Sequence, residues 1–189
     1  MNKIYSQLLS LIVIGLVPAA AYAHTGMEVT GFIAGVLHPL TGLDHLLAMI
    51  AVGLWASQMG KKATWTLPSS FIAVMVLGAL LPVMGISVPY VETGILLSLL
   101  VLGGLIATKL PMAISMMIVG CFGLFHGYAH GAEASSISVA YIAGFVLTTA
   151  MLQTMGVMLG SRLRQLNVAK ITHFMGGMIA MTGLYFVFA

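Results

Sequence analysis

The chain has 189 residues, of which 60% are hydrophobic and only 6% are charged, and its mean hydropathy is +1.11. This composition excludes an ordinary soluble globular domain and indicates a protein that is solvated mostly by lipid. The formal net charge of +3 comes from basic residues scattered between apolar stretches, which does not make a basic patch for a nucleic acid. The single cysteine, Cys121, excludes an intrachain disulfide.

The N-terminus has the pattern of a secretory signal peptide. An apolar run from Leu8 to Val17 follows a basic residue and precedes a small-residue motif that ends at Ala23. We expect cleavage after Ala23, which removes residues 1–23. His24 would then begin the mature chain, with an α-amine and an imidazole that together could bind a metal ion. The alternative is that His24 is an ordinary mature N-terminus.

The mature chain, residues 24–189, falls almost entirely into apolar stretches of about 20 residues, the length at which a helix crosses the hydrocarbon core. The links between the stretches carry Gly, Pro and polar residues. The sequence therefore predicts an all-α fold, a polytopic transmembrane helical bundle that forms a single domain. Its six predicted spans are residues 31–57, 64–84, 91–108, 112–130, 139–160 and 171–188.

The basic residues predict how these spans are oriented. A cleaved signal peptide places the new N-terminus outside, and cytoplasmic links hold most Lys and Arg. The basic residues after residue 23 lie in or beside the links after the first, third and fifth spans, and the other links have none. We therefore expect both mature termini to lie outside the cytoplasm. The residues behind this prediction are Lys61, Lys62, Lys109, Arg162, Arg164 and Lys170.

Ionisable side chains are costly inside a span, so each is a candidate functional residue. The fourth predicted span ends with the string FHGYAHGAE, residues 125–133. His126 and His130 are four residues apart, which on a helix places both imidazoles on one face and within reach of one metal ion. Glu133 continues the same stripe. A structural role for the set is the alternative.

The first predicted span contains the string HPLTGLDH, residues 38–45. On an unbroken helix, His38 and His45 would lie about 10 Å apart, too far to bind one ion. Either the helix bends or the two histidines belong to sequential sites. Pro39 and Gly42 favour a bend or an unwound turn. Asp44 could bind metal itself, orient the imidazole of His45, or form a proton relay with it.

With the predicted orientation, both strings lie toward the exterior face, where a cation would enter. Glu92, at the outer start of the third span, would add negative charge to this mouth, or it is a solvated helix end. Other polar or soft residues carry weaker indications. Thr149 and Gln153 are interpreted as ties between helices, and the 15 methionines as gap fillers in the apolar core.

The signal peptide followed by His24-Thr25-Gly26, the string HPLTGLDH and the string FHGYAHGAE resemble the HupE/UreJ family of bacterial membrane proteins over the whole chain. This resemblance implies a secondary nickel or cobalt permease of the bacterial inner membrane that supplies hydrogenase or urease maturation. It also implies roles in metal handling for the residues of the two strings, which are His38, Asp44, His45, His126, His130 and Glu133.

Imidazole and carboxylate ligands suit Ni²⁺, Co²⁺ or Zn²⁺, of which the resemblance favours the first two. No phosphate-binding Gly-rich loop occurs in the sequence, so we expect no nucleotide hydrolysis and no required cofactor. The expected partners are lipid and the transported ion, with no nucleic acid, and a homo-oligomer is left open. The competing prediction is an intramembrane hydrolase with a catalytic zinc site formed by His, Asp and Glu. Histidines spread along a path favour the permease, which is not an enzyme.

Overall fold

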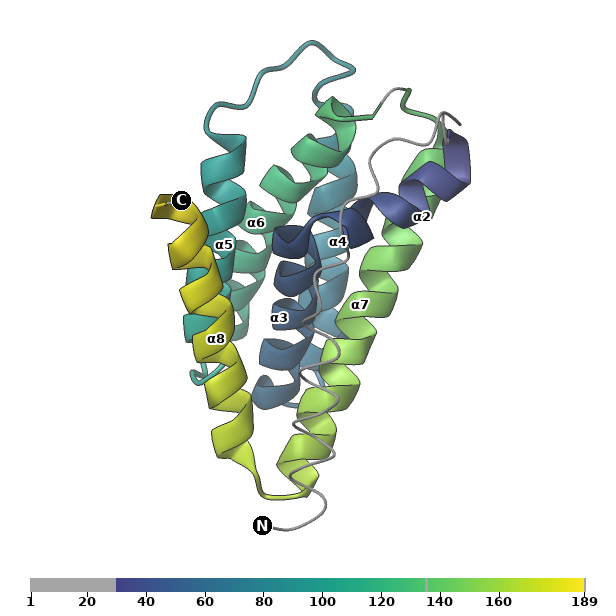
Figure 1. The fold of residues 1–189 in the computed structure, drawn as a ribbon. Helices are drawn as coiled ribbons and strands as arrows, with labels where there is room; N and C mark the ends of the chain where they lie inside the picture. Colours follow the sequence, from purple (N-terminus) through teal and green to yellow (C-terminus); the bar gives the residue numbers. More distant parts are fainter. Residues whose placement is uncertain (1–29, 135, 189) are drawn as a thin grey trace.

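The structure is a computed structural model that describes residues 30–134 and 136–188, and these residues form helices and links without any strand. Figure 1 shows the helices, most of which run side by side as a bundle. This confirms the predicted all-α fold. The predicted signal peptide and His24 lie outside the described residues. The helices are α2 Gly31–Thr41, α3 Leu43–Met59, α4 Ala63–Leu80, α5 Val91–Leu105, α6 Met112–Ala132, α7 Val139–Gln165 and α8 Ala169–Phe188.

Several helices are long and apolar enough to cross a membrane. Four helices in the described part of the chain meet both conditions alone, namely α4, α6, α7 and α8. The pair α2 and α3 makes a fifth candidate if it is counted as one bent span. The helix α5 has 15 residues and is thus about 22 Å long, less than the roughly 30 Å of a hydrocarbon core. The chain is therefore a membrane protein with four or five candidate spans, and six spans remain a prediction.

The first predicted span is divided into two helices. The axes of α2 and α3 differ by 83°, and Gly42 between them is extended, with φ −97° and ψ 118°. In Figure 1, α2 lies across the bundle near one end, while α3 runs down its centre. The predicted bend near Pro39 and Gly42 is thus confirmed, and a single straight helix over residues 31–57 is excluded.

Glycines allow the closest helix contacts. In α6, a Cβ on Gly123, Gly127 or Gly131 would collide with backbone atoms of α4. These three residues recur every four positions, so one face of α6 lies flat against α4 without side chains between the backbones. The close approach fixes the height of α6, and with it the height of His126 and His130, relative to the other helices.

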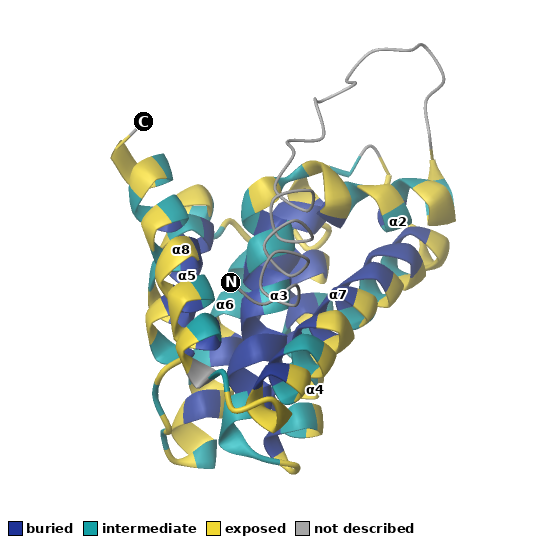
Figure 2. Cartoon of the chain, turned by 60° about the horizontal axis from the view of Figure 1, so that its bottom comes forward, coloured by how far each residue is buried: buried dark blue, intermediate teal, exposed yellow. Residues whose placement is uncertain are grey.

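The surface and the interior are distributed as expected for a bundle in lipid. Figure 2 shows buried residues on the facing sides of the helices and exposed residues on the outside. Large apolar side chains such as Trp65, Met117 and Phe174 are exposed. The interior, in contrast, contains polar side chains, including three histidines and a glutamine. Since polar groups are costly to bury, this interior needs a functional explanation.

Candidate metal-binding site

Four of the six histidines of the chain come together in one cluster. The ring centroids of His38 and His130 are 4.8 Å apart, those of His45 and His130 are 4.9 Å apart, and those of His45 and His126 are 5.0 Å apart. The centroids of His38 and His45 are 6.2 Å apart. The two sequence strings therefore form one cluster, which the sequence left undecided. We refer to these four residues as the histidine cluster.

Two local features produce this convergence. The i, i+4 spacing places His126 and His130 on one face of α6, as the sequence predicted. The break at Gly42 turns α2 across the end of α3, so that His38 and His45 approach much more closely than on a straight helix. With this bend, His38 and His45 are close enough to belong to one site.

The spacing within the histidine cluster suits a shared ion. Two imidazoles bound to one ion through nitrogens at about 2.1 Å have their centroids about 5 Å apart in tetrahedral geometry. Three of the measured separations lie near this value. However, among residues 30–134 and 136–188, no three side chains of His, Cys, Asp or Glu are positioned to hold one ion as they stand. Ring rotations would be required for coordination.

The deeper members of the cluster have ring nitrogens that lack hydrogen-bond partners. These buried atoms are Nε2 of His45, Nδ1 of His126 and both ring nitrogens of His130. Buried polar atoms are normally paired, and unpaired ones in a native interior often mark a site for an ion or water. The free nitrogens are therefore available as ligands.

The carboxylate of Asp44 orients the imidazole of the adjacent residue, His45. One oxygen of its carboxylate, Oδ1, lies 3.0 Å from Nδ1 of His45 and accepts the backbone N–H of the same residue at 2.8 Å. An ionised carboxylate can only accept a hydrogen bond, so Nδ1–H of His45 donates to it and Nε2 keeps its lone pair. This is the arrangement in which a carboxylate outside the ligand set fixes a metal-binding imidazole.

Ser98 plays the corresponding role for His126, and the sequence did not single it out. The hydroxyl of Ser98 donates to the carbonyl of Ile95 at 2.6 Å, and its oxygen lies 3.1 Å from Nε2 of His126. Since the hydroxyl proton is used, Nε2–H of the imidazole donates to the serine oxygen. The lone pair of His126 then lies on Nδ1, the atom without a partner.

Glu133 contacts the outermost histidine. Its carboxylate oxygen Oε2 lies 3.3 Å from Nε2 of His38, and the side chain of Glu133 is 57% exposed. The hydrogen bond from His38 lowers the pKa of this carboxyl below its ordinary value. Glu133 is therefore ionised at neutral pH and carries a negative charge at the outer edge of the cluster.

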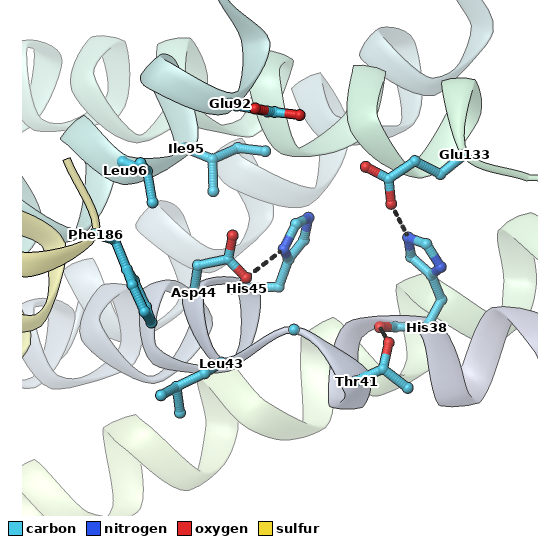
Figure 3. A pocket seen from close by; sticks show the side chains of 11 residues that line it. His38, Thr41, Leu43, Asp44, His45, Glu92, Ile95, Leu96, Glu133 and Phe186 are labelled. Carbon is cyan, nitrogen blue, oxygen red and sulfur yellow. Dashed lines mark hydrogen bonds and ion pairs between the residues drawn. The ribbon is translucent and has the colours of Figure 1, made fainter. Parts of the chain in front are cut away.

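An open cavity of about 460 Å³ leads to the cluster. Figure 3 shows His38, Asp44, His45, Glu92 and Glu133 around it. Three of the four acidic residues in the whole chain thus line one cavity. The negative charge would concentrate cations at its mouth. Glu92 lines this cavity together with residues of both strings, and its side chain has no ion-pair partner among the described residues.

Two aromatic residues, which sequence analysis also missed, hold His130. The ring of Phe145 stacks on the imidazole of His130 with centroids 5.1 Å apart and an interplanar angle of 13°. The hydroxyl of Tyr141 donates to the backbone carbonyl of His130 at 3.0 Å. Both residues lie on α7, where they resemble ordinary apolar positions in the sequence. Only the tertiary structure, which brings these side chains of α7 to His130, gives them this role.

Comparison with known proteins identifies the same family that the two strings resemble. The model of the HupE / UreJ protein family matches residues 11–186. The chain belongs to the HupE/UreJ family. A relative named Protein HupE, from Rhizobium leguminosarum bv. viciae, is 40% identical over 183 residues, which covers 95% of this chain and 96% of the relative. No solved structure matches the chain.

The family match confirms the resemblance inferred from the sequence. The matched region of the HupE/UreJ family includes both strings, the helices α2 to α7, α8 up to residue 186, and the residues that line the cavity. The residues of the histidine cluster therefore lie within the part of the chain that the family shares. Their roles as metal ligands, and those of Asp44, Glu92, Glu133 and His24, remain predictions.

Proposed function

We propose that this member of the HupE/UreJ family is a secondary permease that carries a divalent transition-metal ion, Ni²⁺ or Co²⁺, into the cell. The resemblance described above implies that the ion supplies maturation of a metalloenzyme such as hydrogenase or urease. The observation that carries the proposal is the histidine cluster with unpaired ring nitrogens behind an acidic cavity. The ion is the substrate, and the chain itself is not an enzyme.

The burial of the ligands changes in the order that a permeation path requires. Glu133 at the edge of the cavity is exposed, His38 has a side chain 22% exposed, and His126 and His130 are fully buried. An ion that enters the cavity would therefore exchange water for carboxylate and then for imidazole, in steps. Imidazole and carboxylate are ligands that Ni²⁺ and Co²⁺ bind well. No feature of the described residues favours the intramembrane hydrolase.

The driving force follows from the charge of the ion. We propose the bacterial inner membrane as the location, with the cavity open to the exterior. The membrane potential is worth about 2.3 kcal/mol per elementary charge per 100 mV, and thus about twice that for a divalent ion. Inward movement of Ni²⁺ therefore needs no nucleotide.

The test is uptake by the purified protein in proteoliposomes. The vesicles contain a metal-sensing dye, and an inside-negative potential is imposed with a potassium gradient and valinomycin. Saturable entry of Ni²⁺, Co²⁺ or Zn²⁺, compared with protein-free vesicles, establishes transport and ranks the substrates. Tight binding of metal without entry under the same potential would refute the permease and leave a binding protein.

Uptake is expected to fall as the pH is lowered from 7 to 5. An imidazole binds metal only when it is neutral, so protons compete with the metal ion for the histidine cluster. The pKa of Glu133 is lowered by His38, so this carboxylate stays charged over the range and does not cause the fall. Initial rates at fixed free metal and fixed potential measure the effect. Flat uptake from pH 7 to 5 would contradict proton competition at the cluster over this range.

Substitution of Ser98 with Ala is expected to weaken metal binding about tenfold, since removal of a group that orients a metal-binding histidine typically costs 10–100-fold in affinity. The matched control is Ser57→Ala. Ser57 is also fully buried and donates to the carbonyl three residues earlier at 2.6 Å, but on Leu54 rather than near a histidine. Isothermal titration of the solubilised variants with Ni²⁺ compares them. Equal affinities in the two variants would show that Ser98 does not act through His126.

A further inference from the structure

A second group of polar and sulfur-containing side chains is buried in the bundle, beside and inward of the histidine cluster. Its members are Met49 on α3, Met75 on α4, and Thr149 and Gln153 on α7, and all four are fully buried. We refer to them as the thioether group. The three helices that carry them pack against one another around the axis of the bundle (Figure 1).

The thioether group continues the helix faces that form the histidine cluster. On α3, Met49 follows His45 by four residues, one turn and about 6 Å farther from the cavity. On α7, Thr149 follows Phe145, the residue stacked on His130, by the same spacing, and Gln153 follows by one more turn. Met49 and Gln153 therefore lie inward of the imidazoles, while Met75 on α4 packs against Gly127 of α6, beside His126.

In this group, methionine sulfur atoms accept the side-chain hydrogen bonds. The hydroxyl of Thr149 donates to Sδ of Met75 at 3.7 Å, and the amide nitrogen of Gln153 donates to Sδ of Met49 at 4.0 Å. Sulfur is a weak acceptor. Elsewhere in the structure, Thr66 and Thr182 donate to the carbonyl four residues earlier, the usual bond for a threonine within a helix.

The amide oxygen of Gln153 is buried and has no hydrogen-bond partner. An uncharged amide that only ties helices together would have both ends paired, because an unmade buried hydrogen bond costs stability. Here a free oxygen and two thioether sulfurs lie in the centre of the bundle. All three are neutral atoms with lone pairs, and all three can bind a transition-metal cation.

We propose that Met49, Met75 and Gln153 form a second, weaker binding site for the divalent transition-metal ion, which begins beside His126 and extends inward. This inference rests on the proposed function as a permease. Thr149 is a positioning residue that orients the sulfur of Met75. Weak neutral ligands suit this place, because an ion must bind well enough to enter and loosely enough to leave, often over several sites. The ion would pass from the imidazoles to this site on its way to the cytoplasm.

The experiment compares four variants with the wild type in the Ni²⁺ uptake assay in proteoliposomes and in Ni²⁺ titration of the solubilised protein. Gln153→Leu removes the amide oxygen, and Gln153→Met replaces it with a thioether. Met75→Leu removes a sulfur with little change in volume, a change that cores usually tolerate. The control is Met155→Leu, since Met155 lies on α7 but is 58% exposed.

We expect Gln153→Leu and Met75→Leu to slow uptake on the order of tenfold while Ni²⁺ affinity at the imidazoles stays within about twofold. Gln153→Met should keep most of the wild-type rate, because it restores a ligand but not a hydrogen bond. Met155→Leu should behave as the wild type. This pattern separates ligation from packing, since packing would not distinguish Leu from Met at residue 153.

Two results would overturn the inference while leaving the permease intact. One is wild-type uptake in both Gln153→Leu and Met75→Leu. The other is equal slowing by Gln153→Leu and Gln153→Met, which would show that only the amide hydrogen bond matters. A wild-type protein that takes up no metal would instead overturn the proposed function, so the two failures are distinguishable.

Discussion

Replacement of His126 with Ala is expected to abolish metal uptake, with a loss of at least about 100-fold in the initial rate. Removal of a group outside the ligand set already costs 10–100-fold in metal affinity, and a ligand should cost more. His126 is fully buried, and its Nδ1 is free while Ser98 holds Nε2. Dye-loaded proteoliposomes under an inside-negative potential measure the loss.

The control for this change is His173→Ala. His173 lies near the start of α8, is exposed, and belongs to neither string. Its replacement should leave uptake unchanged. Because Ala leaves a cavity at a buried position, a second variant, His126→Asn, keeps a polar side chain there. Near-normal uptake by both His126 variants, each monodisperse in size-exclusion chromatography, would remove the histidine cluster from the transport path.

Replacement of Asp44 with Ala is expected to lower Ni²⁺ affinity and uptake by about 10–100-fold. The carboxylate fixes both the tautomer and the direction of the His45 ring, through contacts at 3.0 Å to Nδ1 and 2.8 Å to the backbone nitrogen. Without it, Nδ1 of His45 is no longer required to carry the proton, and Nε2 is no longer directed as a lone pair into the cluster. Titration with Ni²⁺ and uptake are measured on the same preparation.

The comparison variant for Asp44 is Glu92→Ala. Both carboxylates line the same cavity, but Glu92 makes no ion pair with an imidazole in the described part of the chain. Loss of Glu92 should reduce only the attraction of cations to the mouth, an effect that salt screens. We expect less than about a threefold change at physiological ionic strength. Equal losses for the two variants would show that Asp44 acts through its charge alone and not through His45.

The sequence by itself determined the elements that depend on local spacing. Apolar stretches of about 20 residues predicted helices, and the described helices follow them within a few residues at most ends. The exceptions are shifts such as the end of α5 at Leu105 rather than residue 108 and the extension of α7 to Gln165. The pairing of His126 with His130 also followed from the period of one helix, as did the bend near Pro39 and Gly42.

The tertiary structure alone decided which distant residues meet. The sequence could not show that an 83° break would bring His38 to His130, because the angle depends on how α2 packs across α7. It could not assign Ser98 or Phe145 to a histidine, since Ser and Phe are common in apolar helices, and nothing in their spacing refers to α6. It also treated Gln153 as an ordinary tie between helices.

The physical reason for this division is the range of the interactions. Helix formation, amphipathic spacing and the cost of a charge in lipid act within one turn or one span, so they leave a pattern in consecutive residues. The contact of Ser98 with His126, in contrast, joins residues 28 positions apart and depends on the rotation and height of two helices. The close approach of Gly127 to α4 sets that height for α6. The sequence thus determined which residues carry the chemistry, and only the packing of the helices decided which of them form one site.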